Sequence, residues 1–321
     1  MKVAFFCFLW YNWKDNISLG GVDMAHFQTE QTKFALKFLG VNGGSSESHT
    51  NAFFFPDPET LVFLDLSLLN FAKARQILES RRGVLKRVIA LVTHLHPDHA
   101  SGIVMLGYGV RHVLENVTLE VITDVSFGID AMAHFDTEGG KAIYDEERGR
   151  FDEIYRLYAL RNCFGTRHRI FVGQSGELQE TIDDVFSLPT WFFRVIPTDH
   201  APRLSGATGF EFELDRKRIV YSGDTRESEP FFKAVREAYD EDPEMPIELY
   251  LEVSSTKWPV HLYLPDIKQS LIELLLDVPT AKVILMHYDN RYAIAKEVLI
   301  ANRIMDAIDN PRIFLAEDNL F

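Results

Sequence analysis

Four side chains that can bind metal ions lie within six positions of the sequence: His94, His96, Asp98 and His99. If they were buried for packing alone, each polar group would need its own hydrogen-bond partner. A metal ion satisfies several such groups at once. Alternate residues of an extended segment face the same side, so His94 and His96 would share one point, and the turn at Pro97 would bring the other two to a second. This pattern favours two adjacent metal ions, and a solvated polar loop is the alternative.

Predicted secondary structure places this block between a strand and a helix. The apolar run at 87–92 is short and rich in β-branched residues, which is typical of a buried strand. Residues 100–106 predict the start of a helix. The metal-binding side chains are therefore expected in the loop where a strand ends.

The block resembles the His-x-His-x-Asp-His signature of the metallo-β-lactamase superfamily. Three later segments match further motifs of that superfamily in the same order, each after a predicted strand: Thr198-Asp199-His200-Ala201, Ser222-Gly223-Asp224-Thr225 and Met286-His287. The pair Arg291-Tyr292 is familiar in the ribonuclease Z-like branch of the superfamily. The resemblance implies an α/β fold, a four-layer αββα sandwich with metals at one rim between two sheets.

The same resemblance implies seven metal ligands in two groups. The first ion would be bound by His94, His96 and His200. The second would be bound by Asp98, His99 and His287, with Asp224 as the bridge, and Asp98 counts among the catalytic residues as well. Asp199 is expected to neighbour a ligand without being one. A donor set of nitrogen and oxygen without cysteine suits two Zn²⁺ ions, and it also suits Mn²⁺ or Fe²⁺.

Asp65 follows the predicted strand 60–66, where the superfamily usually carries a structural Asp at the rim of the metal site. It would orient a metal-bound histidine through the second ring nitrogen. The alternative is that Asp65 caps the predicted helix 68–82.

A proton donor is also suggested by the resemblance. In ribonuclease Z-like enzymes, a Glu in a His-Glu-Ala-Thr block and a later His occupy positions comparable to Glu252 and His261. The block here reads Leu251-Glu252-Val253-Ser254, and it is closer to what cyclic-nucleotide phosphodiesterase relatives would carry. Such a pair could protonate an alkoxide leaving group. The alternative is that His261 only precedes and caps a helix.

The length of chain between motifs argues against transfer-RNA processing. Ribonuclease Z enzymes insert their RNA-gripping arm between the third and fourth motifs, but here only 24 positions separate His200 from Asp224. The extra chain lies instead at about 124–187, where near-helical spacing of Ile143, Tyr144, Ile154, Tyr155 and Leu157 predicts a helical insertion. Such an insertion would be core, or a lid or arm of a homodimer.

Composition limits the classes of partner. The chain has 321 residues, 33 basic against 47 acidic, and a net charge of −14, which disfavours a broad nucleic-acid-binding surface. The two cysteines, Cys7 and Cys163, indicate no disulfide framework and fit a reducing, cytoplasmic compartment. No apolar run approaches the ~20 residues that would span a bilayer.

The first 32 residues are expected to be an extension that precedes a single metallo-β-lactamase-like domain at 33–321. They mimic a short signal peptide but lack a small-residue cleavage site. Gly20-Gly21 can be encoded as a ribosome-binding sequence before Met24, so we hypothesise a misassigned start. N-terminal sequencing that finds Met1 would remove this hypothesis.

The function expected from these features is metal-dependent hydrolysis of a cyclic nucleotide or another small phosphodiester. A hydroxide held between two metal ions is a strong nucleophile near neutral pH. Carboxylic ester or lactone hydrolysis uses the same metals without the pair of Glu252 and His261. The remaining alternatives are RNA 3′-processing by a ribonuclease Z-like endonuclease and a non-catalytic binding or sensor domain. Loss of ligands would favour the last, and all seven are present.

Overall fold

The computed structural model describes residues 34–43, 49–114, 117, 119–124, 126–128, 130–131, 155–161, 168–172, 178–179, 189–201, 206–254, 257–288 and 310–317, with the backbone alone at 155–179. The extension at 1–32, the pair Arg291-Tyr292 and both cysteines therefore lie outside the described residues.

The first sheet has eight strands, which lie side by side in the order of the sequence. They are β1 (Lys37–Gly40), β2 (Asn51–Asp57), β3 (Thr60–Leu64), β4 (Arg87–Leu91), β5 (Leu119–Asp124), β6 (Tyr155–Arg161), β7 (His168–Val172) and β8 (Leu178–Gln179). Strands β3 to β6 are parallel, and the pairs outside this block are antiparallel. The carboxyl ends of β3, β4 and β5 therefore meet at one edge.

The second sheet has six strands and runs in the order β14-β13-β12-β11-β10-β9. Its strands are β9 (Phe192–Thr198), β10 (Ala207–Leu214), β11 (Lys217–Tyr221), β12 (Ile247–Glu252), β13 (Ala281–Met286) and β14 (Ile313–Leu315). Strands β11 to β14 are parallel, which again gathers several carboxyl ends at one edge.

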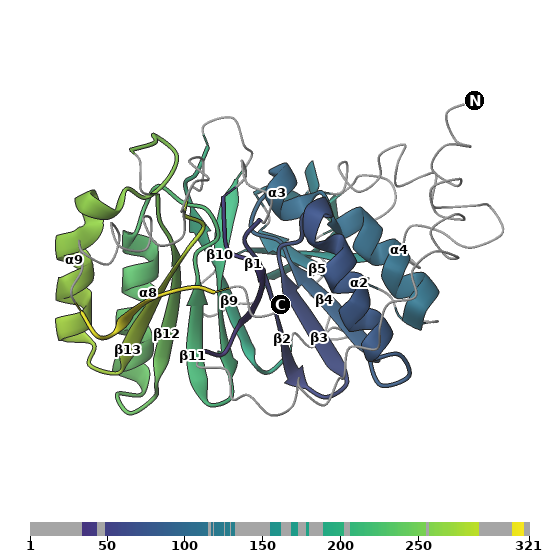
Figure 1. The fold of residues 1–321 in the computed structure, drawn as a ribbon, viewed down its shortest axis with the longest axis horizontal. Coiled ribbons are helices and arrows are strands. Elements are labelled where there is room, and N and C mark those ends of the chain that lie inside the picture. Colours follow the sequence, from purple (N-terminus) through teal and green to yellow (C-terminus); the bar gives the residue numbers. More distant parts are fainter. Residues whose placement is uncertain are drawn as a thin grey trace.

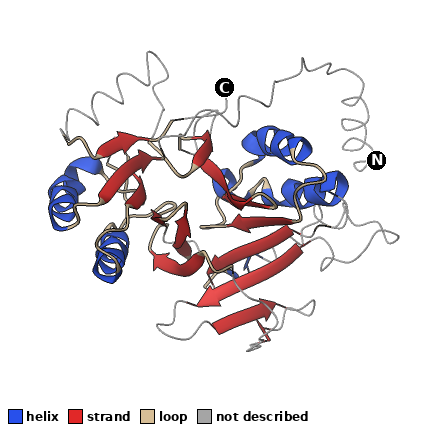
Figure 2. Ribbon diagram, turned by 90° about the horizontal axis from the view of Figure 1, so that it is seen from below, coloured by secondary structure: helices blue, strands red, loops and turns tan. Residues whose placement is uncertain are grey.

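Helices cover the outer face of each sheet (Figures 1 and 2). Figure 1 shows α2 (Phe71–Ser80) and α4 (Ile103–Leu114) along one flank and α8 (Glu229–Glu241) and α9 (Leu264–Asp277) along the other. Two short helices, η2 (Leu68–Asn70) and α3 (Pro97–Ala100), lie near the strand ends of the first sheet. The predicted four-layer αββα sandwich is confirmed.

Alternation along the strands explains why two faces of the first sheet are buried. In β4, Val88 and Ala90 pack with residues of α2 and α4, whereas Ile89 and Leu91 pack with residues of the second sheet. Successive side chains of a strand point to opposite faces, so a strand between a helix layer and a second sheet is apolar throughout. Between the sheets, the rings of Phe54 and Phe212 stack with centroids 4.7 Å apart.

Backbone hydrogen bonds join the two sheets at the edge where the parallel strands end. The amide of Thr208 in β10 donates to the carbonyl of Thr93 after β4, at 2.9 Å. The amide of His287 after β13 donates to the carbonyl of Val41 after β1, at 3.0 Å. Loops that follow strands of both sheets are thereby fixed against one another.

The predicted helical insertion at about 124–187 is helical at Gly128, Asp130 and Ala131, but it is wrong at 155–161, 168–172 and 178–179. Tyr155–Arg161, His168–Val172 and Leu178–Gln179 are strands, and β6 pairs in parallel with β5. In β6, apolar residues fit a two-residue period as well as a helical one, and pairing with an existing sheet edge decides between the two. Residues 132–154, with Ile143 and Tyr144, lie outside the described residues.

Each described helix is too short or too polar to cross a membrane.

Truncation of Phe212 should test the contact between the sheets. Phe212 is fully buried against Phe54, so Phe212→Ala leaves a cavity and should lower the free energy of unfolding by roughly 3–5 kcal/mol. Urea denaturation measures this as a lower midpoint with an unchanged slope. Leu276→Ala is the control, because Leu276 is 72% exposed and its loss should cost less than about 0.5 kcal/mol. Equal midpoints for both variants would contradict this packing.

Candidate metal centre

At three strand ends, a left-handed backbone conformation turns the chain at or next to a predicted site residue. Asp65 after β3 and His287 after β13 adopt left-handed backbone conformations, with φ of 57° and 59°. Such conformations are uncommon for residues other than glycine and occur often at functional sites. After β11, Gly223 has φ of 59°, and a Cβ there would lie 2.6 Å from the Cβ of Thr93. Only glycine fits at this position, directly before Asp224.

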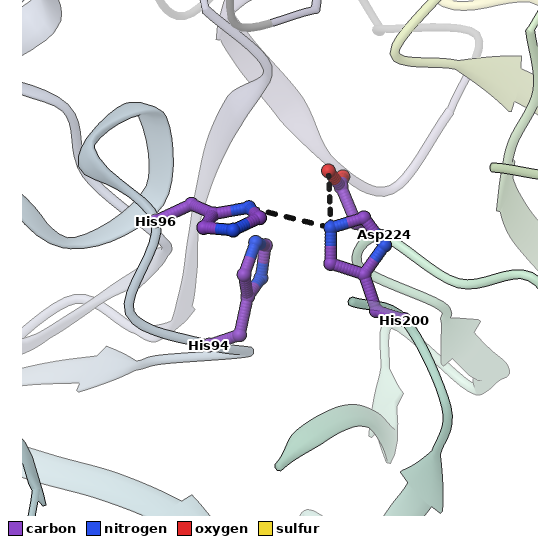
Figure 3. Close-up of side chains that lie close together, drawn as sticks. All are labelled: His94, His96, His200 and Asp224. Atoms are coloured by element: carbon purple, nitrogen blue, oxygen red, sulfur yellow. Dashed lines mark hydrogen bonds and ion pairs between the residues drawn. The ribbon is translucent and has the colours of Figure 1, made fainter. Parts of the chain in front are cut away.

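The first group of predicted ligands comes from both sheets (Figure 3). His94 and His96 follow β4, His200 follows β9, and Asp224 follows β11. Their ligand atoms all lie within 4.8 Å of one another. The Nε2 atom of His200 is 3.3 Å from Nδ1 of His96 and 3.6 Å from Oδ2 of Asp224. This spacing allows one ion to contact all four side chains.

The second group contains Asp98 and His99 from α3, His287 after β13, and again Asp224. Oδ1 of Asp224 lies 3.2 Å from the Nε2 atoms of both His99 and His287. Oδ2 of Asp98 lies 3.4 Å from His99 and 3.6 Å from His287. Because its two oxygens face different groups, Asp224 is placed to bridge two ions.

Several atoms of these groups are buried without a hydrogen-bond partner. They are Nε2 of His94, His99 and His287 and Oδ1 of Asp224. Buried polar atoms normally find a partner, and those that do not need an explanation. All four belong to residues of these two groups, whose ligand atoms lie within 4.8 Å of one another, so a divalent cation fits the residues that are present.

The second ring nitrogens of two ligands are hydrogen-bonded, which fixes the atom that each offers to a metal. Nδ1 of His99 lies 2.8 Å from Oδ2 of Asp65, and Nδ1 of His200 lies 2.7 Å from the carbonyl oxygen of Val260. Each Nδ1–H therefore donates to an oxygen and leaves Nε2 for the ion. Asp65 also accepts hydrogen bonds from the amide and hydroxyl of Thr93, at 2.8 and 2.7 Å.

This geometry decides between the two interpretations of Asp65. The side chain that caps the following helical turn is Ser67, whose oxygen accepts from the amide of Asn70. Asp65 is fully buried against His99 and orients its ring.

Neighbouring carboxylates raise the pKa values of two predicted ligands, His99 and His287, when no metal is bound. Burial alone would lower the pKa of His99, but Asp224, Asp98 and Asp65 raise that pKa well above its usual value. Burial likewise opposes the effect of Asp224 on His287, and the net pKa of His287 is raised to about 10. A metal-bound imidazole is neutral, so metal binding must displace these protons.

Glu252 and His261 lie beside the second group, and with Asp224 and His287 they form a third cluster of side chains close enough to hold a metal ion. Nδ1 of His261 is 2.8 Å from Oε2 of Glu252, and Oε1 of Glu252 accepts the amide of Leu262 at 3.0 Å. Glu252 is fully buried, whereas 23% of the His261 side chain is exposed. Oε2 of Glu252 also lies 3.4 Å from Nδ1 of His287. The structure thus brings the predicted pair together and connects it to a predicted ligand.

The supporting roles of three further residues were not predicted from the sequence. Asn51 donates from Nδ2 to the carbonyl of Asp98, at 3.1 Å, and its Oδ1 accepts from the amide of Ser67. Thr93 connects Asp65 to the metal loop, and the hydroxyl of Ser222 accepts the amide of Glu252 at 3.0 Å. Each acts across a long sequence separation, so spacing could not have revealed it.

Asp199 lies next to His200 but forms an ion pair with Arg226. The two side chains are 42% and 40% exposed, and neither belongs to a metal-binding group among the described residues.

Comparison with solved structures finds the same fold in several proteins. YhfI from Bacillus subtilis, described as a metallo-beta-lactamase fold protein, is similar with a TM-score of 0.56 at 12% identity over 88% of this chain and 95% of that one. Unliganded yeast PDE1 gives 0.55 at 16% identity over 88% and 97%. A long form RNase Z from yeast gives 0.53 at 17% identity over 86% of this chain and 41% of that one. No protein-family profile and no curated protein sequence matches the chain. The chain has the metallo-β-lactamase fold.

Asp224→Ala should leave fewer than two metal equivalents bound, because it removes a carboxylate that both groups share. Elemental analysis of the purified variant after dialysis measures this directly. Two retained equivalents, together with unchanged activity, would contradict the ligand assignment.

Asp65→Asn should weaken binding of one metal ion by about 10- to 100-fold, because the carboxylate that holds His99 is replaced by a neutral amide. Asparagine tolerates the left-handed backbone, so the turn itself should survive. Competition with a chelator of known affinity gives the dissociation constants.

Asp199→Asn is the matched control for Asp65→Asn, since it neutralises a carboxylate next to a ligand without touching either metal group. Metal affinities that fall equally in both variants would mean that overall charge, and not the orientation of His99, is responsible.

Proposed function

We propose that this protein is a dinuclear metal-dependent hydrolase whose substrate is a small phosphodiester, such as a cyclic nucleotide. The observation that carries the proposal is the pair of Glu252 and His261, held 2.8 Å apart beside the two groups that contain the seven predicted ligands. Hydrolysis of a phosphodiester with a sugar alkoxide as leaving group needs both a nucleophile and a proton donor.

Two divalent ions, when bound, supply a nucleophile from water and polarise a phosphoryl oxygen. The chain's own residues have the remaining tasks. Asp224 sets the separation of the two groups, and Asp65 and the carbonyl of Val260 keep His99 and His200 in the tautomer that offers Nε2. The nitrogen and oxygen ligands favour zinc, with manganese or iron as alternatives.

His261 supplies the proton in this proposal. Burial lowers its pKa, but Glu252 and Asp224 raise the pKa more, so the net value lies above the ordinary one. Because Nδ1 donates to Glu252, the proton on Nε2 is the one available to a substrate. With 23% of its surface exposed, the ring can reach a leaving group that enters from solvent.

A small substrate is favoured over structured RNA by the chain between His200 and Asp224. Its described part forms the strands β10 and β11, which pair as a hairpin closed by the two-residue turn Asp215-Arg216. This short connection offers no arm to grip RNA. The similarity of fold to both yeast PDE1 and a yeast RNase Z is compatible with phosphodiester chemistry in general.

A substrate panel tests the proposal. The metal-free protein, reconstituted with Zn²⁺ or with Mn²⁺, is assayed on bis-p-nitrophenyl phosphate, cyclic nucleotides, a homoserine lactone and a pre-tRNA. Hydrolysis of the phosphodiesters, lost on chelation and restored by metal, is the expected result. Activity confined to the lactone would identify a carboxylic ester hydrolase, and cleavage of the pre-tRNA alone would identify an RNA-processing enzyme.

His261→Ala should slow hydrolysis of substrates with a poor alkoxide leaving group by about 10²- to 10⁴-fold, the usual effect of losing a positioned acid. The rate on a nitrophenyl ester should change little, because its phenolate departs without a proton. Steady-state kinetics on both substrates, with metal content measured in parallel, give the comparison.

His261→Ala is a cleaner test than a Glu252 variant, since Glu252 contacts both His261 and the ligand His287. Metal content should remain at the wild-type level. Equal rate losses on both kinds of leaving group would mean that His261 positions substrate, and loss of metal would make His261 a ligand.

A further inference from the structure

We propose that Trp258 is a specificity-determining residue that stacks on the base of a nucleotide substrate, an inference that rests on the proposed phosphodiesterase function. It belongs to the loop at 257–263 between β12 and α9, which also carries Val260 and His261.

The base of this loop is held rigidly. The amide of Ser254 donates to the carbonyl of Leu262 at 2.7 Å, and Ser254 also forms a bridge with Tyr263. The carboxylate of Glu252 accepts hydrogen bonds from two residues of the loop, from the amide of Leu262 and from the ring of His261. These contacts hold Ser254, His261 and Leu262 in place at the described ends of the loop.

The tip is a β-turn that contains Trp258 and His261 at its two ends. The amide of His261 faces the carbonyl of Trp258 at 3.5 Å, and Pro259 occupies the second position, where its fixed φ favours a turn. The Cα atoms at the ends of a β-turn lie within about 7 Å. Trp258 is therefore a near neighbour of the proposed proton donor.

The same turn contacts the metal centre. The carbonyl of Val260 accepts Nδ1–H of His200, and the rings of His200 and His261 lie 5.0 Å apart. The backbone of the turn that carries Trp258 therefore borders the metal centre.

Trp258 is 37% exposed, and it is the aromatic member of the large exposed apolar residues in the described part of the chain. The others are aliphatic: Leu68, Leu69, Val84 and Leu276. A large indole left in contact with water beside a reaction site suits a planar ligand, since every nucleobase presents a face for stacking.

One nucleotide substrate would contact both ends of the turn, with its leaving oxygen at His261 and its base at Trp258. In a cyclic nucleotide, the leaving oxygen and the base are attached to the same ribose. If His261 protonates the oxygen, the base must lie within a few ångströms of it, and the face of Trp258 is the aromatic surface that the same turn presents. The chemical class of substrate is therefore a nucleoside phosphodiester.

The test compares two substrates that differ only in the base: a cyclic nucleotide and the cyclic phosphate of a ribose that lacks one. In Trp258→Leu, which keeps apolar bulk but no aromatic face, KM for the cyclic nucleotide should rise roughly 5- to 150-fold, as expected for the loss of one stacked base. Trp258→Phe should retain most of the affinity. KM for the base-free substrate, kcat on both substrates and the metal content should stay unchanged.

Leu276→Ala is the control, because it removes an exposed apolar side chain at the end of α9. An equal rise in KM for both substrates in Trp258→Leu, or no rise for either, would overturn stacking while leaving phosphodiester hydrolysis intact. If the wild-type protein hydrolyses neither substrate, the proposed function itself fails and this inference falls with it.

Discussion

The burial of one carboxylate constrains the whole edge where the two sheets meet. Asp224 is 2% exposed, and a carboxylate removed from water is costly unless charges and donors surround it. Imidazoles from three other loops provide these: His99 and His287 lie 3.2 Å from Oδ1, and His200 lies 3.6 Å from Oδ2. Although burial raises the pKa of Asp224, His287 and His99 hold it well below its usual value. The ion pairs therefore form only if the strand ends of the two sheets keep their positions relative to one another.

The positions of these strand ends depend on backbone conformations that most residues avoid. The chain turns through the left-handed region at Asp65, Gly223 and His287, directly after β3, β11 and β13. Strain of this kind persists only where surrounding contacts determine it. Hydrogen bonds do so here, since Asp65 accepts three of them and the amide of His287 is bound by the carbonyl of Val41. These hydrogen bonds therefore help to fix the positions of the predicted ligands.

Local patterns allowed much of this arrangement to be predicted. The spacing of ligands at 94–99 and the apolar run at 87–92 are local features, and they predicted a metal-binding loop after a buried strand. The resemblance of the motifs to the metallo-β-lactamase superfamily implied the αββα sandwich, which is confirmed. The helix predicted at Tyr155–Arg161 is wrong because this segment pairs with β5, and the periodicity of the segment alone does not reveal that partner. The roles of Asn51 and Thr93 were equally inaccessible. Their partners, Asp98 and Asp65, are 47 and 28 positions away.

The loop at 257–263 contacts a predicted metal ligand and carries both the proposed proton donor and Trp258, which limits how the site can work. Val260 fixes His200, and Glu252 fixes both His261 and the amide of Leu262, so movement of the loop would disturb a predicted metal ligand and the predicted proton donor together. A mechanism in which this loop closes over the substrate would therefore have to break the hydrogen bond that sets the tautomer of His200. Side chains on a loop that stays in place can select the substrate without breaking this hydrogen bond. The exposed indole of Trp258 is such a side chain.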